Sequence, residues 1–387
     1  MKRGPTGDYQ TITIAEETIR AFIPRALPPE PPLEFGTQRQ RLLERATLAL
    51  GRLDSVMLLL PQPDLFLYAY VRREAVLSSQ IEGTQSTLDQ LLLFELEEAP
   101  GVPLDDVVEV SNYVAALNHG LKRLREGFPL SNRLTREMHA VLLASGRGSE
   151  KTPGEFRRSQ NWVGGTRPGN AHFVPPPPQH VGDCMSALER FLHGESNPYP
   201  VLIKAALAHV QFETIHPFLD GNGRIGRLLI AFVLHHDRVL SQPLLYLSLY
   251  FKQHRAEYYR LLDEVRINGD WEAWLDFFLE GVEYTANNAV EIAKRLLALF
   301  RQDEQAIQRA QRSPSTVLRV FQVLRERPLT TIKDVCRRTG LSFPAAAKSI
   351  ERLEQAGIVR EITGRKRDRV FAYEAYLKIL GEGIEPV

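Results

Sequence analysis

The stretch His216-Pro-Phe-Leu-Asp-Gly-Asn-Gly-Arg-Ile-Gly-Arg227 decides both the fold and the chemistry expected of this chain. An apolar helical pattern ends near Thr214, and Pro217 prevents that helix from continuing. Asp220-Gly-Asn-Gly223 then forms a tight turn, and we expect a new helix to begin at about Asn222. Because the glycines add no side-chain bulk and the first N–H groups of a helix are free, this turn predicts a phosphate-binding site.

Four side chains of the stretch supply the chemistry of such a site. Arg224 and Arg227 are three residues apart, so both face one side of the expected helix, where they can bind phosphate oxygens. Asp220 is a hard carboxylate suited to Mg²⁺, and His216 can act as a general base near neutral pH. A lone histidine at a helix end or a lone Gly-x-Gly is usually structural, but packing alone does not explain their joint occurrence.

The stretch 216–227 resembles the signature of the Fic domain family, HPFx(D/E)GNGRxxR, at every specified position. Pro153-Gly-Glu-Phe-Arg157 and residues 161–178 resemble the target-binding flap of that family and the segment before it. The resemblance covers roughly residues 33–310 and implies transfer of AMP from ATP to a hydroxyl side chain of a target protein. The Doc branch of the family, which transfers phosphate, has Lys where this chain has Gly223, so the glycine favours nucleotidyl transfer. The motif does not fix the nucleotide base.

The resemblance also implies a role for each residue of the motif. His216 would deprotonate the attacking Ser, Thr or Tyr hydroxyl, and Asp220 would coordinate a Mg²⁺ that bridges the α- and β-phosphates. Phe218 would anchor the loop in the core. Arg224 would bind the β-phosphate and Arg227 the γ-phosphate. An anion hole would be formed by the backbone groups of Gly221, Asn222 and Gly223. The side chain of Asn222 would also contact phosphate.

Our candidates for the adenine pocket lie on both sides of the motif. The segment 245–250 and the pair Tyr258-Tyr259 supply apolar and aromatic surfaces, and from the former we select Leu249 and Tyr250. Gln211 precedes His216 on the expected helix and would face the same pocket. The alternative, which the sequence leaves open, is that these aromatic residues form the core of a pair of helices.

A second motif, Ser78-Ser-Gln-Ile-Glu82-Gly83, matches the (S/T)xxxE(G/N) inhibitory motif of the Fic family. Taken alone, Glu82 is a solvated residue one turn after Ser78 near a helix end. With the resemblance, Glu82 would form a charge-assisted pair with Arg227 and displace the γ-phosphate from its productive position. A further hypothesis is that Glu82 positions a water molecule for removal of AMP in some states.

The remaining pattern predicts a mainly α fold: a Fic-type helical bundle with a small β-hairpin flap, on which the N-terminal helices with Glu82 pack. Residues 24–33 are too rich in proline for a helix and indicate an extended arm. Turn dipeptides within 154–179, flanked by Trp162-Val163 and 172–174, predict the flap, although a plain surface loop is the alternative. The expected helices cover about 42–53, 65–79, 87–97, 105–125, 135–145, 181–193, 201–214, 224–236, 254–265 and 270–311.

The C-terminal segment predicts a winged helix-turn-helix domain. Three helical patterns, with Ser342 as the cap of the third, precede two alternating segments at 358–362 and 369–373. The basic loop 363–368 between these strands would be the wing. A DNA-binding regulator is therefore our alternative function, with a protein-interaction module as the plainer explanation of the same fold. The expected basic contacts are Arg337, Arg338 and Lys348 on the helices and Arg365, Lys366, Arg367 and Arg369 on the wing.

The composition supports this division of the chain. The 387 residues have a formal net charge of +1 and are 43% hydrophobic, which is typical of globular domains. Between residues 311 and 380 there are 15 basic and 7 acidic residues, or +8, which leaves 33 basic and 40 acidic residues, or −7, elsewhere. We predict an N-terminal helical region over 1–103, a catalytic domain over 104–310 and the winged helix over 311–387.

The sequence also bears on location and partners. Two distant cysteines give no disulfide framework, and no segment approaches the roughly 18 apolar residues of a membrane helix. We expect a cytoplasmic protein that binds ATP and Mg²⁺, acts on target proteins and has no membrane partner. Assembly into a homo-oligomer that controls Glu82 is left open.

Overall fold

A computed structural model describes residues 2–14, 16–59, 63–97, 104–194, 198–310 and 315–384. Within these residues the chain is mainly helical, with 15 α-helices and two small antiparallel sheets. The predicted fold class is thereby confirmed. The predicted domain boundaries at residues 103 and 311 lie outside the described residues.

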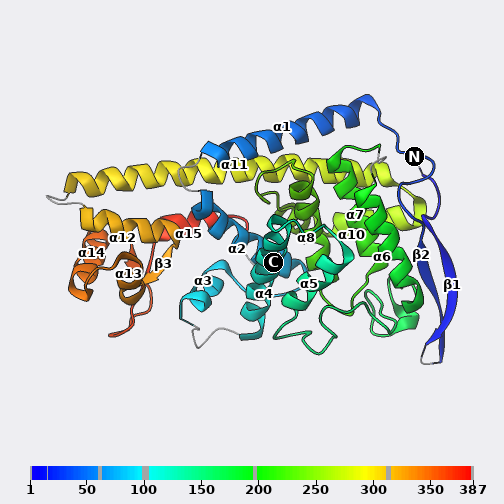
Figure 1. Ribbon diagram of the computed structural model, residues 1–387, viewed down its shortest axis with the longest axis horizontal. Helices are drawn as coiled ribbons and strands as arrows, with labels where there is room; N and C mark the ends of the chain where they lie inside the picture. Colours follow the sequence, from blue (N-terminus) through cyan, green and yellow to red (C-terminus); the bar gives the residue numbers. More distant parts are fainter. Residues whose placement is uncertain are drawn as a thin grey trace.

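Two long helices form one side of the molecule. α11 (Trp271–Ala310) has 40 residues, and α1 (Thr37–Leu59) runs along it (Figure 1). Ion pairs join the two helices at their rims, between Arg39 and Asp276 at 2.7 Å and between Arg45 and Glu283 at 3.0 Å. Since α11 continues beyond this contact to α12 of the winged helix, it connects both parts of the molecule (Figure 1).

The bundle that carries the motif surrounds two buried helices, α7 (Val201–Ile215) and α8 (Asn222–His236). Both are buried over most of their circumference, which explains why α7 is apolar on nearly every face. The other helices of the bundle are α2 (Pro63–Ile81), α3 (Leu88–Glu97), α4 (Leu104–Arg125), α5 (Asn132–Leu142), α6 (Pro178–His193), α9 (Ser248–Gln253) and α10 (Arg255–Asn268).

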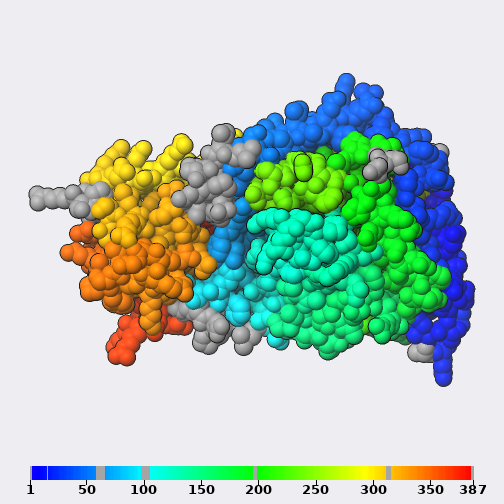
Figure 2. Space-filling view, viewed as in Figure 1, coloured from blue at the N-terminus to red at the C-terminus, as the bar shows by residue number. Residues whose placement is uncertain are grey.

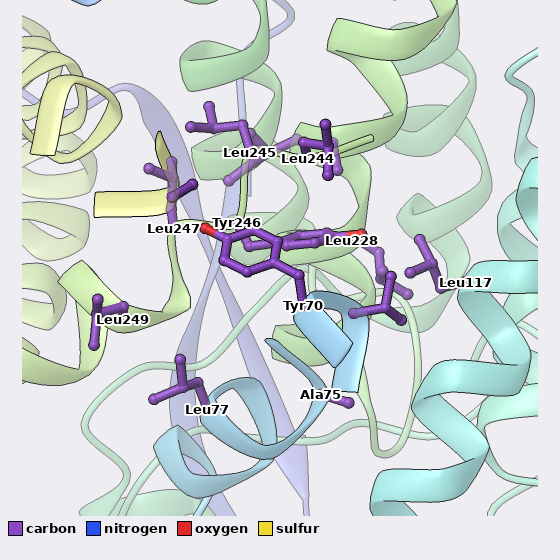
Figure 3. Close-up of a cluster of buried hydrophobic side chains, with 14 of the residues drawn as sticks. Tyr70, Ala75, Leu77, Leu117, Leu228, Leu244, Leu245, Tyr246, Leu247 and Leu249 are labelled. Carbon is purple, nitrogen blue, oxygen red and sulfur yellow. The ribbon is translucent and has the colours of Figure 1, made fainter. Parts of the chain in front are cut away.

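One hydrophobic cluster fixes α2 against α8 (Figure 3). Tyr70 of α2 packs on Tyr246, with ring centroids 5.6 Å apart, and Leu228 of α8 lies in the same cluster. These side chains are at most 5% exposed, and each contributes roughly 1.5–3 kcal/mol by burial. The helix with the second motif is therefore held rigidly beside the helix with the first.

An N-terminal β-hairpin is one of the elements that the sequence did not predict. β1 (Gly7–Ile14) and β2 (Glu17–Pro24) pair antiparallel, in register from Gly7↔Pro24 to Ile14↔Glu17. The β-branched residues of 11–14, in which polar Thr alternates with apolar Ile, are the signal for it. The hairpin packs on the flap, where the Phe22 N–H donates to the Val174 carbonyl at 2.9 Å.

The flap has the expected turn but little regular strand. Val163 and Phe173 form an isolated antiparallel bridge, and a 3₁₀ turn (Pro168–Asn170) closes the segment. The flanks predicted as short strands are thus reduced to one pair of residues. Glu17 of β2 accepts from the Gly169 N–H at 2.6 Å and pairs with Arg167, so the N-terminal hairpin supports the flap turn.

The C-terminal part is a winged helix. It comprises α12 (Ser315–Glu326), β3 (Leu329–Thr331), α13 (Ile332–Thr339), α14 (Phe343–Gln355), β4 (Arg360–Glu361), β5 (Val370–Ala372) and α15 (Glu374–Gly381), with strand order β3-β5-β4. Ser342 occupies the N-cap of α14, but its side chain makes no capping hydrogen bond there, in contrast to Thr331 at α13. β3 and α15 were not predicted, because three residues and eight residues give weak periodicity.

The winged helix forms a distinct lobe at one end of the molecule, and its wing loop projects from that lobe (Figure 2). Among the described residues, every helix is too short or too polar to span a bilayer.

Candidate active site

The motif 216–227 links the two central helices. α7 ends at Ile215, and His216 at its C-cap adopts a left-handed conformation, φ 49° and ψ 60°, which reverses the chain. Gly221, at φ 77°, occupies the N-cap of α8, where its lack of a Cβ removes the cost of positive φ. The predicted start of the second helix at Asn222 is correct.

Hydrogen bonds within the loop fix its shape. Asn222 bridges the loop, since its Oδ1 accepts from the Phe218 N–H at 2.9 Å and its Nδ2 donates to the Phe218 carbonyl at 2.8 Å. Phe218 is fully buried, as expected of an anchor. The expected contact of the Asn222 side chain with phosphate would therefore require breaking these two hydrogen bonds. The backbone N–H of Asn222 lies in the first turn of α8, where N–H groups have no acceptor within the helix.

Arg157 connects the loop to the flap base. Its Nε donates to the His216 carbonyl at 2.9 Å, its Nη2 to the Pro176 carbonyl at 2.5 Å, and its backbone N–H to the Pro217 carbonyl at 2.9 Å. Burial lowers the pKa of this guanidinium to about 10, so it is still charged at neutral pH. The segment 153–157 is therefore part of the site, as its place next to the flap suggested.

His216 is neutral in this environment. Burial lowers the pKa of its imidazole to about 4, and the charges of Arg157 and Arg266 add to this effect. Its Nδ1 is buried and makes no well-aligned hydrogen bond within the described part of the chain. A neutral imidazole has a free lone pair at pH 7, which a general base requires.

Arg224 is a buried cation at the start of α8. Its Nη1 lies 2.7 Å from Oε1 of Glu109 on α4, and its Nη2 donates to Oδ1 of Asp220 at 3.3 Å. Its Nε makes no hydrogen bond to any described residue, although Arg224 is only 2% exposed. Buried unsatisfied donors beside a helix N-terminus are suited to an anion.

Arg227 brings the two motifs together. Its Nη2 donates to Oε1 of Glu82 at 2.7 Å and to the Ser78 carbonyl at 2.9 Å, and its Nε donates to Oγ of Ser78 at 2.9 Å. Glu82 and Arg227 are 145 residues apart in sequence. Gly83, at φ 99°, ends the turn that follows α2. A Cβ on Gly223 would collide with the Glu82 carboxylate, so the glycine allows the close approach of α2 to α8.

The charge of the pair depends on this contact. Burial by itself would raise the pKa of Glu82, but the charge of Arg227 and the hydrogen bond from it outweigh burial and hold that pKa below its ordinary value. Burial likewise lowers the pKa of Arg227, and the charge of Glu82 more than compensates and raises it. Both groups are therefore ionised at neutral pH, with the Arg227 side chain 2% and the Glu82 side chain 34% exposed.

Family models match three segments of the chain: Fic/DOC family N-terminal over residues 40–122, Fic/DOC family over 129–234, and winged helix-turn-helix DNA-binding over 314–360. Together with the complete motif, these matches decide the family. The chain is a Fic domain protein with a C-terminal winged helix.

Relatives of this Fic domain protein include the protein adenylyltransferases Fic of Drosophila ananassae and Drosophila melanogaster. Each is 32% identical over 209 residues, which is 53% of this chain and 39% of the relative. The match therefore spans about two fifths of the length of these relatives.

Solved structures share the fold. A Fic family protein from Desulfovibrio desulfuricans G20 has a TM-score of 0.58 at 19% identity, covering 89% of this chain and 98% of that chain. Fic-1 from C. elegans has a TM-score of 0.51 at 21% identity, covering 66% and 73%. The first of these likenesses extends the common fold to most of the chain.

Asp220 of the Fic domain fits a single carboxylate ligand for Mg²⁺. Its Oδ1 accepts from the Gly221 N–H at 2.5 Å. A Cβ on Gly148 would lie only 2.9 Å from the other carboxylate oxygen, Oδ2, so the glycine leaves space beside that oxygen. Groups of three or more acidic, His or Cys ligands do not occur among the described residues. One carboxylate completed by substrate phosphates is the usual mode of Mg²⁺ binding, and the role of Asp220 in it stays a prediction.

Of the candidates for the adenine pocket, Tyr258 and Tyr259 lie close enough to Arg227 of the motif to interact with its charge, and the remaining candidates are packed among neighbouring side chains. Gln211 is buried and its Nε2 donates to the Arg25 carbonyl at 2.8 Å. Tyr250 packs against Phe277, with ring centroids 5.0 Å apart, and Leu249 is buried next to Gly383. The structure thus places these side chains in packing contacts, in line with the alternative that they belong to a helical core. A role for them in binding adenine stays a prediction.

Two buried acids near the arginines were not singled out from the sequence. Glu109 contacts Arg224, and it also accepts from Oγ1 of Thr84 at 3.3 Å, immediately after the second motif. Glu74 accepts from Tyr113 and Ser248 beneath Arg227, and burial raises its pKa to about 7. The available signal was a charged residue within an apolar helical stretch, such as Glu109 between valines.

Proposed function

We propose that this Fic domain protein is a self-inhibited protein adenylyltransferase. It transfers AMP from ATP to a Ser, Thr or Tyr hydroxyl of target proteins and of itself. The observation that carries the proposal is the Glu82–Arg227 contact at the N-terminal end of α8, where two motifs distant in sequence meet beside the buried guanidinium of Arg224. The names of the Drosophila relatives support the same reaction class.

At the α-phosphorus, the proposed reaction forms one bond and breaks one. The target hydroxyl loses its proton to neutral His216, and its oxygen attacks the α-phosphorus of ATP. The bond between the α-phosphorus and the bridging oxygen breaks, and diphosphate leaves. The free N–H groups at the start of α8 and the Arg224 guanidinium stabilise the negative charge that develops on the phosphates. Mg²⁺ held by Asp220 would supply further positive charge there.

Inhibition follows from the position of Glu82. Its carboxylate accepts a hydrogen bond from Nη2 of Arg227, the group that would otherwise bind the γ-phosphate. Productive binding of ATP then requires the carboxylate to leave, which costs the free energy of the ion pair. The enzyme is held in a low-activity state as long as α2 stays packed on α8.

The test compares the purified wild type with three variants: Glu82→Gly, His216→Ala and the double variant Glu82→Gly/His216→Ala. Each is incubated with labelled ATP, GTP, CTP or UTP, with and without cell lysate. We expect Glu82→Gly to raise incorporation from ATP and the double variant Glu82→Gly/His216→Ala to abolish it. Equal labelling by the wild type and Glu82→Gly would contradict the inhibitory role. Labelling that persists without His216 would contradict its role as the base.

The same Glu82 would position water for removing AMP in some states. Release of AMP from a pre-modified target by the wild type, and its loss in Glu82→Ala, is the expected result. Release at an unchanged rate in Glu82→Ala would refute this hypothesis.

DNA binding by the winged helix is our second candidate function. The wing residues Arg365, Lys366, Arg367 and Arg369 are exposed, and they lie on the loop that projects from the molecule (Figure 2). On the helices, Arg337 and Arg338 pair with Asp334, but the Arg337 side chain is 74% exposed and Lys348 is exposed as well, so basic charge is accessible on both the helices and the wing. A mobility shift with duplex DNA that weakens with salt would support this function, and no shift at low salt would remove it.

We propose a cytoplasmic location, since two cysteines far apart in the sequence give no disulfide framework of the kind that small secreted domains carry. The division at residues 103 and 310 is our proposal for where inhibition, catalysis and the winged helix lie.

A further inference from the structure

His139 of α5 is a buried histidine outside the motif that contacts the motif loop. It is fully buried, and its ring stacks on the Phe218 ring with centroids 3.7 Å apart and planes 5° from parallel. Its place is between the catalytic loop on one side and Gly154, at the base of the flap, on the other.

The two ring nitrogens of His139 have different partners. The Gly154 N–H donates to Nδ1 at 2.9 Å, and Nε2 lies 3.0 Å from the Asp220 carbonyl. Since a backbone N–H can only donate and a carbonyl can only accept, Nδ1 must be unprotonated and Nε2 must carry the proton. The surroundings therefore select one neutral tautomer, which donates to Asp220.

This donation determines the orientation of one peptide group. In a trans peptide the carbonyl of one residue and the N–H of the next point in opposite directions. With the Asp220 carbonyl held toward His139, the Gly221 N–H must point away from it, and it donates to Oδ1 of Asp220 at 2.5 Å. A Cβ on Gly221 would lie 3.5 Å from the His139 ring, so the loop is in close contact with the imidazole.

The flap base is fixed by the same helix. Besides the bond from Gly154 to His139, Nε of Arg136 donates to the Gly154 carbonyl at 2.8 Å. Gly154 has φ 80°, and a Cβ there would come within 3.0 Å of Ala140. Both backbone groups of Gly154 are thus held by α5, which places the flap base and the catalytic loop against one rigid element.

We propose that His139 is a positioning residue for the reaction: by donating from Nε2 to the Asp220 carbonyl it orients the Asp220–Gly221 peptide, so that the Gly221 N–H holds the Asp220 carboxylate toward the nucleotide phosphates. This inference rests on the proposed function, because the phosphates belong to the proposed substrate. His139 itself contacts neither the substrate nor the reacting atoms.

Two amide variants separate the two bonds of the ring. The amide nitrogen of Gln reaches the position of Nε2, so His139→Gln retains the donor to Asp220. The shorter Asn reaches only the position of Nδ1, so His139→Asn retains the acceptor for Gly154 and loses the donor. Both are made in the Glu82→Gly background, where the rate of auto-modification is high enough to measure, and melting temperatures are recorded for both.

We expect His139→Gln to retain kcat within a few-fold, and His139→Asn to lower kcat on the order of 10- to 100-fold, the usual effect of losing a group that orients a catalytic one. The two variants should have similar melting temperatures. Equal losses of kcat that follow the melting temperatures would overturn the proposal, because a purely structural role depends on stability and not on which nitrogen is replaced.

A second measurement does not depend on activity. Nitrogen NMR of the ¹⁵N-histidine-labelled wild type, with His139→Gln used for assignment, reports which ring nitrogen carries the proton. Protonation at Nε2 is expected, and protonation at Nδ1 would overturn the proposal. If Glu82→Gly transferred no nucleotide at all, the proposed function would fail. The tautomer would still decide whether His139 holds the Asp220 carbonyl.

Discussion

Glu82→Gln removes the charge of the Glu82–Arg227 pair and retains its shape. The pair has a contact of 2.7 Å with an almost fully buried guanidinium and a carboxylate whose side chain is 34% exposed. A hydrogen bond between charged groups contributes roughly 1.5–3 kcal/mol, and partial exposure of one partner reduces this to about 1–1.5 kcal/mol. Since 1.4 kcal/mol is a factor of ten, productive ATP binding should improve about 5- to 12-fold.

The assay is the initial rate of auto-modification at ATP concentrations below KM, which reports kcat/KM. Glu82→Gln should raise this rate about 5- to 12-fold, by the free-energy argument above, and Glu82→Gly should raise it further because it also removes the side chain. Glu44→Gln, at an exposed position of α1, is the matched control and should leave the rate unchanged.

One result would refute the reasoning. If Glu82→Gln had the wild-type rate while Glu82→Gly was activated, the bulk of the side chain and not its charge would inhibit the enzyme. The ion pair would then be irrelevant to regulation.

Three further predictions concern other parts of the molecule. Burial raises the pKa of Glu74 to about 7, above its unfolded value, so the free energy of unfolding should fall as pH rises from 5 to 8. Urea unfolding at both pH values should show that Glu74→Gln abolishes up to ~3 kcal/mol of this fall, and an unchanged fall would contradict the prediction. Arg73→Ala leaves two carbonyls at the C-terminal end of α15 without their donor, so the free energy of unfolding should fall by about 1–3 kcal/mol and proteolysis near α15 should accelerate. Equal rates of proteolysis in the wild type and the variant would argue against this contact. Replacing the wing residues Arg365, Lys366 and Arg367 by Ala should reduce the steepness of log K against log salt for DNA binding by about 2–3. An unchanged slope would show that the wing does not contact phosphate.

Periodicity predicted most of the helices because their packing faces repeat locally. The apolar pattern of 201–214 corresponds to α7, and the glycine turn correctly located the start of α8 at Asn222. Elements whose stability comes from a distant partner were less accessible. β1 and β2 pack on the flap through Phe22 and Val174, which are about 150 residues apart in the chain, and α15 rests on α2 through Arg73.

The sequence by itself determined most of the helices and the chemical groups of the motif: a histidine at a helix end, a glycine turn, a carboxylate and two arginines spaced by three. Its resemblance to the Fic family also pointed to Glu82 as the partner of Arg227. Only the tertiary structure decided which other groups surround them, namely Glu109 at Arg224 and His139 at the Asp220 carbonyl. The physical reason is that these contacts arise where α4 and α5 pack on the loop and α8, and local periodicity specifies which face of a helix is buried but not which residue of another helix it meets.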